Sequence, residues 1–381
     1  MENQQDSQAP DRASTMAQDR PRQNASSQDA GLNFLTIVDQ ARQQPQVAQA
    51  AGLSFESQWQ TPLANGDIRE TIRSDGRQRQ FELHVPKNYD GKSPLPVVYM
   101  MHGITENMDM MREYSQMDKM SDEKNFAVVY MQADKQNFPG TLGIYKENSW
   151  NFDHGTLTPR DKSYDDLDYV KDVKAKVEGS IAIDQEREYL AGFSEGGQAA
   201  QYLAQKMPDT FAGIASVHGT ILDEDPRPGK SNVTPMISIL GDDDNILPLK
   251  GGHGWFSQGA LLKGYLTEIV PKISESRPLA QAPIWAAADG DTVKTVSENS
   301  DQKTTLYSGG KAPVEEIIRH SHFGFFGSTG GQHAWDGGNN GTAGEPHPDL
   351  IQYISRIDRD SDPTFDASRT VINFLLPNKR Q

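Results

Sequence analysis

Residues 188–200 read EYLAGFSEGGQAA, an apolar run that ends in the pattern Gly-x-Ser-x-Gly around Ser194. Small residues that favour a helix follow at once. This order is typical of a nucleophile elbow, a tight strand-to-helix turn that exposes one serine hydroxyl above a sheet. Gly192 and Gly196 suit such a turn because larger side chains there would clash with the neighbouring strand. The stretch therefore predicts a catalytic serine, Ser194, just before a helix.

The pattern by itself could be a glycine-rich turn with a bystander serine, because the chain contains 33 glycines. A catalytic serine also needs a base and an acid, since its hydroxyl is a poor nucleophile at neutral pH. Both are available downstream in the order Ser, Asp, His. The predicted acid is Asp244, just past the apolar run 236–240. Asp242 and Asp243 remain rivals, and the three aspartates could instead form a turn or a cation site.

The predicted base is His333, which lies in a glycine-rich loop late in the chain. Such a loop suits a mobile general base. Its rivals nearby are His320, His322 and His347, which we expect at the surface or in supporting positions. His253 lies in an insertion and could line the pocket.

A second loop is expected to hold the oxyanion. His102 and Gly103 follow the apolar run 96–101, and a His-Gly pair in this place shapes the oxyanion loop. We assign the oxyanion hole to the backbone N–H groups of Ile104 and Glu195. Glu195 is chosen because the helix that it begins directs its free N–H groups toward the developing charge.

Substrate contacts are expected mainly from aromatic side chains, whose faces suit phenolic acids or polyester segments. Core packing is the alternative for the tryptophans, and a hydrophobic plug is the alternative for the apolar loop 321–327. The candidates are His102, Trp150, Trp255, Phe325 and Trp335.

Strand and helix patterns alternate along the chain. Almost continuous apolar runs are typical of strands buried on both faces, and an apolar spacing of three or four residues predicts helices. The alternation predicts an α/β fold, the α/β-hydrolase fold, with a mostly parallel central sheet and helices on both faces. The expected strands are 96–101, 126–131, 188–193, 214–217, 236–240, 304–307 and 314–318, with a hairpin of 67–73 and 79–85 around Asp75-Gly76 and helices at 164–177 and 365–376.

The chain is expected to divide into three parts. Residues 1–31 form a polar tail that we predict to be disordered, residues 32–62 form a helical extension, and residues 63–381 form the catalytic domain. Stretches near 133–163, 249–285 and 321–364 lack clear periodicity. Insertions of this kind after sheet strands usually shape an active site.

Composition limits the remaining function classes. A net charge of −16 spread along the chain repels nucleic acid and anionic membranes. The absence of cysteine excludes disulfides, thiolate metal sites and cysteine catalysis. No apolar stretch reaches membrane-spanning length, and the run Asp358-x-Asp360-x-Asp362 lacks the glycine and glutamate of an EF-hand. We therefore expect no cofactor, no metal ion, no nucleic acid and no membrane as partners.

Several motifs together resemble the polyhydroxybutyrate depolymerase and feruloyl esterase group, carbohydrate esterase family one. The opening runs are QFELHVPKNYD at 80–90 and LPVVYMMHG at 95–103. Further matches follow in family order across 67–376: Asp165-Asp166, IDQEREY at 183–189, the elbow at Ser194, Gly241-x-x-Asp244-x-x-Leu247-Pro248 and His333-x-Trp335.

The resemblance implies a carboxylic ester hydrolase with Ser194, Asp244 and His333 as its triad, acting as a monomer. It implies polyester substrates, hydroxyalkanoate or aromatic, or feruloyl and acetyl esters. Members often carry cysteine after His-Gly, where this chain has Ile104. The family is mostly secreted, but no signal peptide is visible in the first thirty residues. We expect an extracellular protein, exported by a non-classical route or with its leader removed, or else a cytoplasmic one.

Two other functions stay open. A serine peptidase of the same fold would use the same three residues on amide bonds. A binding protein could use the scaffold without catalysis, because a fold does not by itself imply an activity.

Overall fold

The computed structural model describes residues 67–137, 146–153, 160–222, 225, 227–229, 234–244, 246–251, 277–324, 327–329, 331–337 and 364–380. Its main strands are β1 (Ile68–Ser74), β2 (Arg77–His84), β3 (Leu95–Met101), β4 (Ala127–Met131), β7 (Ile183–Phe193), β8 (Gly213–Val217), β9 (Met236–Gly241), β10 (Val293–Glu298), β11 (Gln302–Ser308) and β12 (Val314–Arg319). Two small hairpins are β5 (Lys135–Asn137) with β6 (Lys146–Asn148), and β13 (His322–Gly324) with β14 (Gly327–Thr329). The helices are α3 (Met108–Ser115), α4 (Met117–Lys124), α5 (Asp166–Glu178), α6 (Glu195–Lys206), α9 (Pro278–Asp289) and α11 (Ala367–Leu375).

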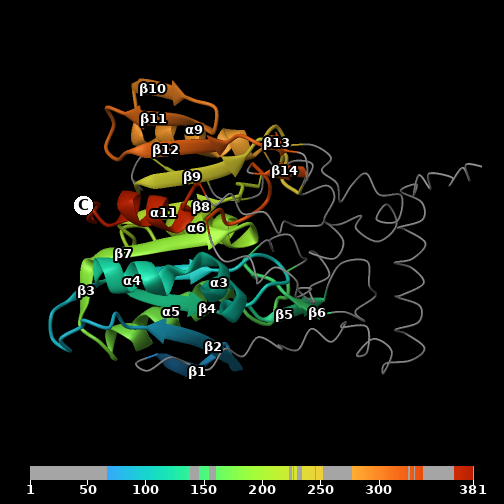
Figure 1. Ribbon diagram of the computed structural model, residues 1–381. Helices are drawn as coiled ribbons and strands as arrows, with labels where there is room; N and C mark the ends of the chain where they lie inside the picture. Colours follow the sequence, from blue (N-terminus) through green and yellow to red (C-terminus); the bar gives the residue numbers. More distant parts are fainter. Residues whose placement is uncertain are drawn as a thin grey trace, which may run out of the picture.

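The ten main strands form one sheet in the order β1-β2-β4-β3-β7-β8-β9-β12-β11-β10, which Figure 1 shows from bottom to top. The six central strands from β4 to β12 run parallel. The outer pairs at both edges are antiparallel. The prediction of an α/β-hydrolase fold with a mostly parallel sheet is confirmed.

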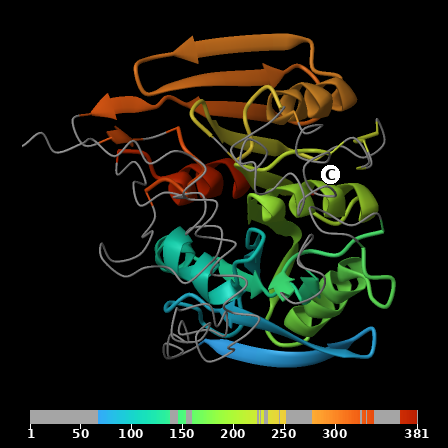
Figure 2. The same cartoon turned by 90° about the vertical axis from the view of Figure 1, so that its right-hand side faces the viewer.

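Helices cover both faces of the sheet (Figure 2). Alternate residues of β3 point to opposite sides, so that Tyr99 packs with α5, α6 and α9, whereas Met100 packs with α3, α4 and α11. Every residue of β3 is buried, as the continuous apolar run predicts. The central strands therefore lie between two hydrophobic cores, one on each face of the sheet.

The predicted hairpin is also confirmed. β1 and β2 are joined by Asp75 and Gly76, with φ of 47° and 75°. Both residues adopt the left-handed conformation of a two-residue hairpin turn, which Asp-Gly sequences favour.

Some elements were not predicted. Strand β10 has no buried residue, so it carries no apolar signal. Helix α9 lies partly in the expected insertion 249–285 and contains Pro283, which obscures its period. Strand β7 begins at Ile183, earlier than the apolar run indicates.

The expected tail 1–31 and extension 32–62 lie outside the described residues, as do residues 338–363 of the last insertion. Among the helices that the structure describes, none is both long and apolar enough to cross a lipid bilayer.

Candidate active site

The carboxyl ends of the central strands bring the predicted residues to one edge of the sheet. Because β3, β7, β8 and β9 are parallel neighbours, the loops that follow them meet there. His102 follows β3, Ser194 follows β7, His218 follows β8 and Asp244 lies shortly after β9. His333 reaches the same place from the loop after β14.

Ser194 lies in the tight turn that its sequence predicts. Its φ of 54° and ψ of −119° are strained for a residue other than glycine, and α6 begins directly after it. The chain on either side is very close: a Cβ on Gly192 would lie 2.1 Å from the carbonyl oxygen of Gly196. A Cβ on Gly196 would lie 2.0 Å from the carbonyl oxygen of Met101. The elbow therefore requires both glycines.

We expect Gly196→Ala to lower the free energy of unfolding by about 3 kcal/mol or more, because the added methyl group meets backbone that cannot move aside cheaply. The matched control is Gly179→Ala, where φ is −80° and the nearest atom to the added Cβ lies at 3.5 Å. This control should change the free energy by less than about 0.5 kcal/mol. Urea denaturation of both variants checks the prediction, and equal stability of the two would contradict it.

Asp244 is buried and accepts four hydrogen bonds. Its Oδ1 accepts the backbone N–H groups of Ile246 and Leu247 at 2.9 and 2.8 Å. Its Oδ2 accepts Nδ1 of His333 at 2.7 Å and Nδ1 of His218 at 2.9 Å. Burial alone would raise the pKa of this carboxyl, but the charge of His333 and the hydrogen bonds of both histidines outweigh it. The pKa of Asp244 therefore lies well below its ordinary value.

The two rival aspartates lie elsewhere. Asp242 accepts hydrogen bonds from His320 Nδ1 at 2.9 Å and from the backbone N–H of Ser321 at 2.8 Å. Asp243 is half-buried, and its backbone N–H donates to Gly331. Of the three, the structure places Asp244 against His333.

Ser194 and His333 belong to the same small region. The ring of Phe193, next to Ser194, lies 5.1 Å from the ring of His333 between centroids. His333 is hydrogen-bonded to Asp244, and the two described side chains of His333 and Ser194 are not hydrogen-bonded to each other. Contacts of this kind often form or shorten only when substrate binds.

The side chain of His102 is hydrogen-bonded to the backbone of the expected oxyanion loop and of the segment after β4. It is fully buried, its Nδ1 donates to the carbonyl of Gly103 at 2.7 Å, and its Nε2 accepts the N–H of Ala133 at 3.1 Å. The indole N–H of Trp150 donates to the His102 carbonyl at 2.8 Å, and the two rings lie 5.2 Å apart. A Cβ on Gly103 would lie 3.2 Å from Cβ of Ser194, so this loop touches the serine.

Burial lowers the pKa of His102 to about 4, against 6.5 in the unfolded chain. Because the unfolded chain binds the proton first as the pH falls, stability is lost between pH 6.5 and 4. Over this range we expect the free energy of unfolding to fall by about 3 kcal/mol more in the wild type than in His102→Gln. Glutamine keeps an acceptor for Ala133 but does not titrate. Urea denaturation at several pH values measures the difference, and parallel curves would contradict it.

The two expected oxyanion donors belong to the loop after β3 and to the first turn of α6. Ile104 is half-buried, and no group in the described part of the chain accepts its N–H. Glu195 is the first residue of α6, and its carboxylate accepts Oγ of Ser149 at 2.6 Å and the N–H of Trp150 at 3.3 Å. These contacts hold the start of the helix to the segment after β6, and Trp150 of that segment in turn contacts His102 in the loop after β3.

The predicted tryptophan contacts with substrate need correction. Trp150 has no exposed surface, and Trp335 is 1% exposed with its indole N–H donating to Oγ of Ser368 at 2.8 Å. His102 is likewise fully buried. All three side chains pack in the interior, where they support the site without presenting a face to substrate.

The remaining candidate histidines and aromatic residues either lie away from Asp244 and Ser194 or fall outside the described residues. His320 pairs with Asp242, and Nε2 of His322 lies 3.2 Å from Asp301. Trp255, Phe325, His253 and His347 lie outside the described residues.

His218 is the site residue that the sequence analysis missed. It is fully buried against Asp244, and its ring lies 5.4 Å from that of His333. One signal was available: like His102, it directly follows an apolar run and precedes a glycine.

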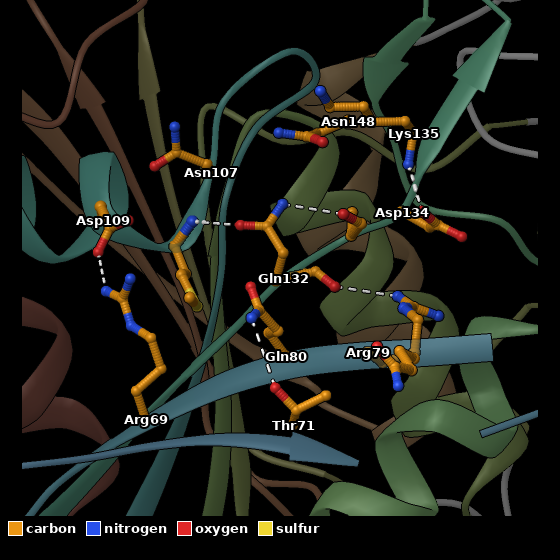
Figure 3. A pocket seen from close by; sticks show the side chains of 13 residues that line it. Arg69, Thr71, Arg79, Gln80, Asn107, Asp109, Gln132, Asp134, Lys135 and Asn148 are labelled. Carbon is orange, nitrogen blue, oxygen red and sulfur yellow. Dashed lines mark hydrogen bonds and ion pairs between the residues drawn. The ribbon is translucent and has the colours of Figure 1, made fainter. Parts of the chain in front are cut away.

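A polar cavity of about 480 Å³ adjoins the loop after β3, whose Asn107 is one of its lining residues (Figure 3). Its wall includes Gln132 and Asn148, and Asn148 holds the loop by donating to the carbonyl of Glu106 at 2.7 Å and accepting the N–H of Thr105 at 2.7 Å. The charged side chains that Figure 3 shows there include Arg69, which pairs with Asp109. No triad residue lines this cavity, so it is distinct from the candidate active site.

Two groups of side chains in the described ranges have donor atoms close enough for a metal ion. One is His218, Asp244 and His333, where the hydrogen bonds already described join the three side chains. The other is Asp67, His84 and Asp118, where the guanidinium of Arg112 already pairs with both aspartates. Neither group needs a metal ion to explain its charges.

Comparison with known proteins finds a matching family and similar sequences and structures. Residues 73–313 match the protein family described as "Putative esterase". The chain is 28% identical over 192 residues to "Putative esterase NocK" of Nocardia uniformis subsp. tsuyamanensis, covering 49% of this chain and 51% of that protein. It is 23% identical over 184 residues to "Feruloyl esterase B" of Piromyces equi, covering 48% of this chain and 32% of that protein. The chain thus spans about half the length, or less, of these curated relatives.

Among solved structures, the acetyl xylan esterase from Aspergillus awamori aligns with a TM-score of 0.45 and 13% identity. The alignment covers 70% of this chain and 94% of that one.

Proposed function

Because this chain belongs to that esterase family, we propose that it is a serine carboxylic-ester hydrolase that acts through an acyl-enzyme. The observation that carries the proposal is the buried hydrogen bond between His333 and Asp244, at the sheet edge where Ser194 occupies a strained elbow. This combination of nucleophile, base and buried carboxylate is the Ser-His-Asp set by which serine hydrolases activate their hydroxyl.

In the first half of the reaction, Oγ of Ser194 attacks the ester carbonyl while Nε2 of His333 accepts the hydroxyl proton. Asp244 stabilises the resulting imidazolium through Nδ1–H. The N–H groups of Ile104 and Glu195 stabilise the oxyanion of the tetrahedral intermediate, and losing one such donor typically costs about 10²–10³ in rate. The intermediate collapses when His333 returns the proton to the alcohol, which leaves.

In the second half, His333 removes a proton from water, and the hydroxide attacks the acyl-enzyme carbonyl. A second tetrahedral intermediate forms at the same oxyanion donors. Its collapse releases the carboxylic acid and returns the proton to Ser194, so the enzyme is regenerated.

The substrate is proposed to be a hydroxyalkanoate or aromatic polyester, or a feruloyl or acetyl ester. Feruloyl esters are supported by the name of one similar protein, a feruloyl esterase. Ester hydrolysis requires no cofactor in this mechanism, because every proton transfer uses His333.

The proposal is tested by a hydrolysis panel. It contains p-nitrophenyl esters from acetate to octanoate, methyl ferulate, a hydroxybutyrate oligomer and a terephthalate diester, each run beside a Ser194→Ala blank. We expect turnover of at least one acyl class that is lost in the blank. No turnover of any ester in the panel would overturn the proposal, and cleavage of a peptide substrate in a parallel assay would then replace it by a serine peptidase.

A further inference from the structure

One carboxylate oxygen of Asp244 accepts hydrogen bonds from two histidines. Oδ2 accepts Nδ1 of His333 at 2.7 Å and Nδ1 of His218 at 2.9 Å, whereas Oδ1 is held by two backbone N–H groups. The hydrogen bond from His333 alone would be enough for Asp244 to orient that imidazole. The contact of the second imidazole, that of His218, with the same oxygen therefore requires a separate explanation.

The backbone of His218 has an unfavourable conformation. Its φ of 48° lies in the left-handed region, which residues other than glycine adopt uncommonly. Its backbone N–H donates to the carbonyl of Ile239 at 2.7 Å, and its side chain has no exposed surface. The turn after β8 thus presents this imidazole to Asp244 in one fixed orientation.

The contact fixes the tautomer of His218. A carboxylate only accepts hydrogen bonds, so Nδ1 of His218 carries the proton. Nε2 is buried and has no hydrogen-bond partner among the described residues. The His218 side chain therefore offers its Nδ1–H to Oδ2 of Asp244.

The charged and titratable groups that face His218 in the described structure are few. Asp244 comes from the loop after β9, and His333 comes from the loop after β14 with its ring 5.4 Å away. From β7, the neighbour is the uncharged ring of Phe193 at 6.2 Å. The effect of His218 is therefore directed at the Asp244–His333 pair.

We propose that His218 is a positioning residue that sets the pH at which His333 can act as a base. Its N–H takes up part of the negative charge of Oδ2, so that Asp244 stabilises the imidazolium of His333 less strongly than an unshared carboxylate would. His333 then loses its proton at a lower pH and is free to accept the proton of Ser194. This inference rests on the proposed function.

Two substitutions separate this role from simple packing. His218→Phe keeps a planar ring but removes the donor. His218→Asn keeps an N–H donor near the position of Nδ1, and asparagine tolerates positive φ. Because Oδ1 of Asp244 remains anchored by Ile246 and Leu247, we expect the carboxylate to stay in place in both variants.

The first measurement is the pH profile of kcat/KM for an ester that the wild type hydrolyses. We expect the acidic midpoint of His218→Phe to rise by about 0.5–1 pH unit, because the lost hydrogen bond acts on His333 only indirectly, through the charge of Asp244. In His218→Asn the midpoint should return toward that of the wild type. Unchanged midpoints in both variants would overturn the inference. So would loss of all turnover in His218→Phe with activity retained in His333→Phe, since His218 would then be the base.

The second measurement does not depend on activity. Proton NMR should show two downfield imidazole N–H resonances, of which His218→Phe removes one and moves the other, while Asp244→Asn perturbs both. If the remaining resonance does not move, the two histidines do not share charge on Asp244 and the inference fails. A wild type that shows both coupled resonances but hydrolyses no ester would overturn the proposed function instead.

Discussion

Ser194→Ala is expected to lower kcat/KM for an activated ester by about 10⁶-fold, the loss typical of removing the nucleophile from a serine triad. Without Oγ no acyl-enzyme forms, and His333 and Asp244 have no hydroxyl to activate. Residual hydrolysis would come from water and the oxyanion donors alone. Steady-state kinetics with a p-nitrophenyl ester measures the loss, and a fluorophosphonate probe should label the wild type at Ser194 but leave the variant unlabelled.

The same substitution should leave the fold intact. Ser194 precedes α6, but its side chain makes no capping hydrogen bond, so alanine removes no helix contact. We therefore expect thermal unfolding within a few degrees of the wild type. A variant that keeps its Tm and retains more than a tenth of the wild-type turnover would show that Ser194 is not the nucleophile.

Asp244→Asn is expected to lower kcat by about 10⁴-fold, the effect of replacing the triad aspartate by its amide in a well-studied serine protease. The amide can present an N–H instead of an acceptor to Nδ1 of His333, which favours the wrong tautomer and removes the charge that stabilises the imidazolium. The loss of charge also removes the acceptor that His218 shares. Kinetics at saturating substrate measures the change.

The matched control is Asp243→Asn, because Asp243 is the adjacent residue, is half-buried and does not contact His333. This control should retain wild-type kcat within about threefold, since surface substitutions away from special features have small effects. Asp242→Asn breaks the contact with His320 and should likewise spare the chemistry. Equal losses in Asp243→Asn and Asp244→Asn would contradict the assignment of the acid.

Most of the central sheet could be predicted from local pattern. The strands β3, β4, β8 and β9 are short apolar runs, because a parallel strand covered on both faces must be apolar on both. The edge strand β10 could not be predicted in this way, since its side chains face solvent and its position depends on pairing with β11. Helices α3 and α4 were also missed: each has only eight residues, too few to establish a period.

For the candidate site, the sequence by itself determined the elbow at Ser194 and the order Ser, Asp, His, because the glycines and the chain order are local or one-dimensional properties. Only the tertiary structure decided that Asp244, rather than Asp242 or Asp243, meets His333. It also decided that Trp150 packs inside and that His218 shares the carboxylate. These outcomes depend on which side chains the parallel strands bring to the same edge of the sheet, and on how fully the surrounding helices and loops bury them. Neither property can be read from the sequence of a single segment, because both depend on segments that are far apart in the chain.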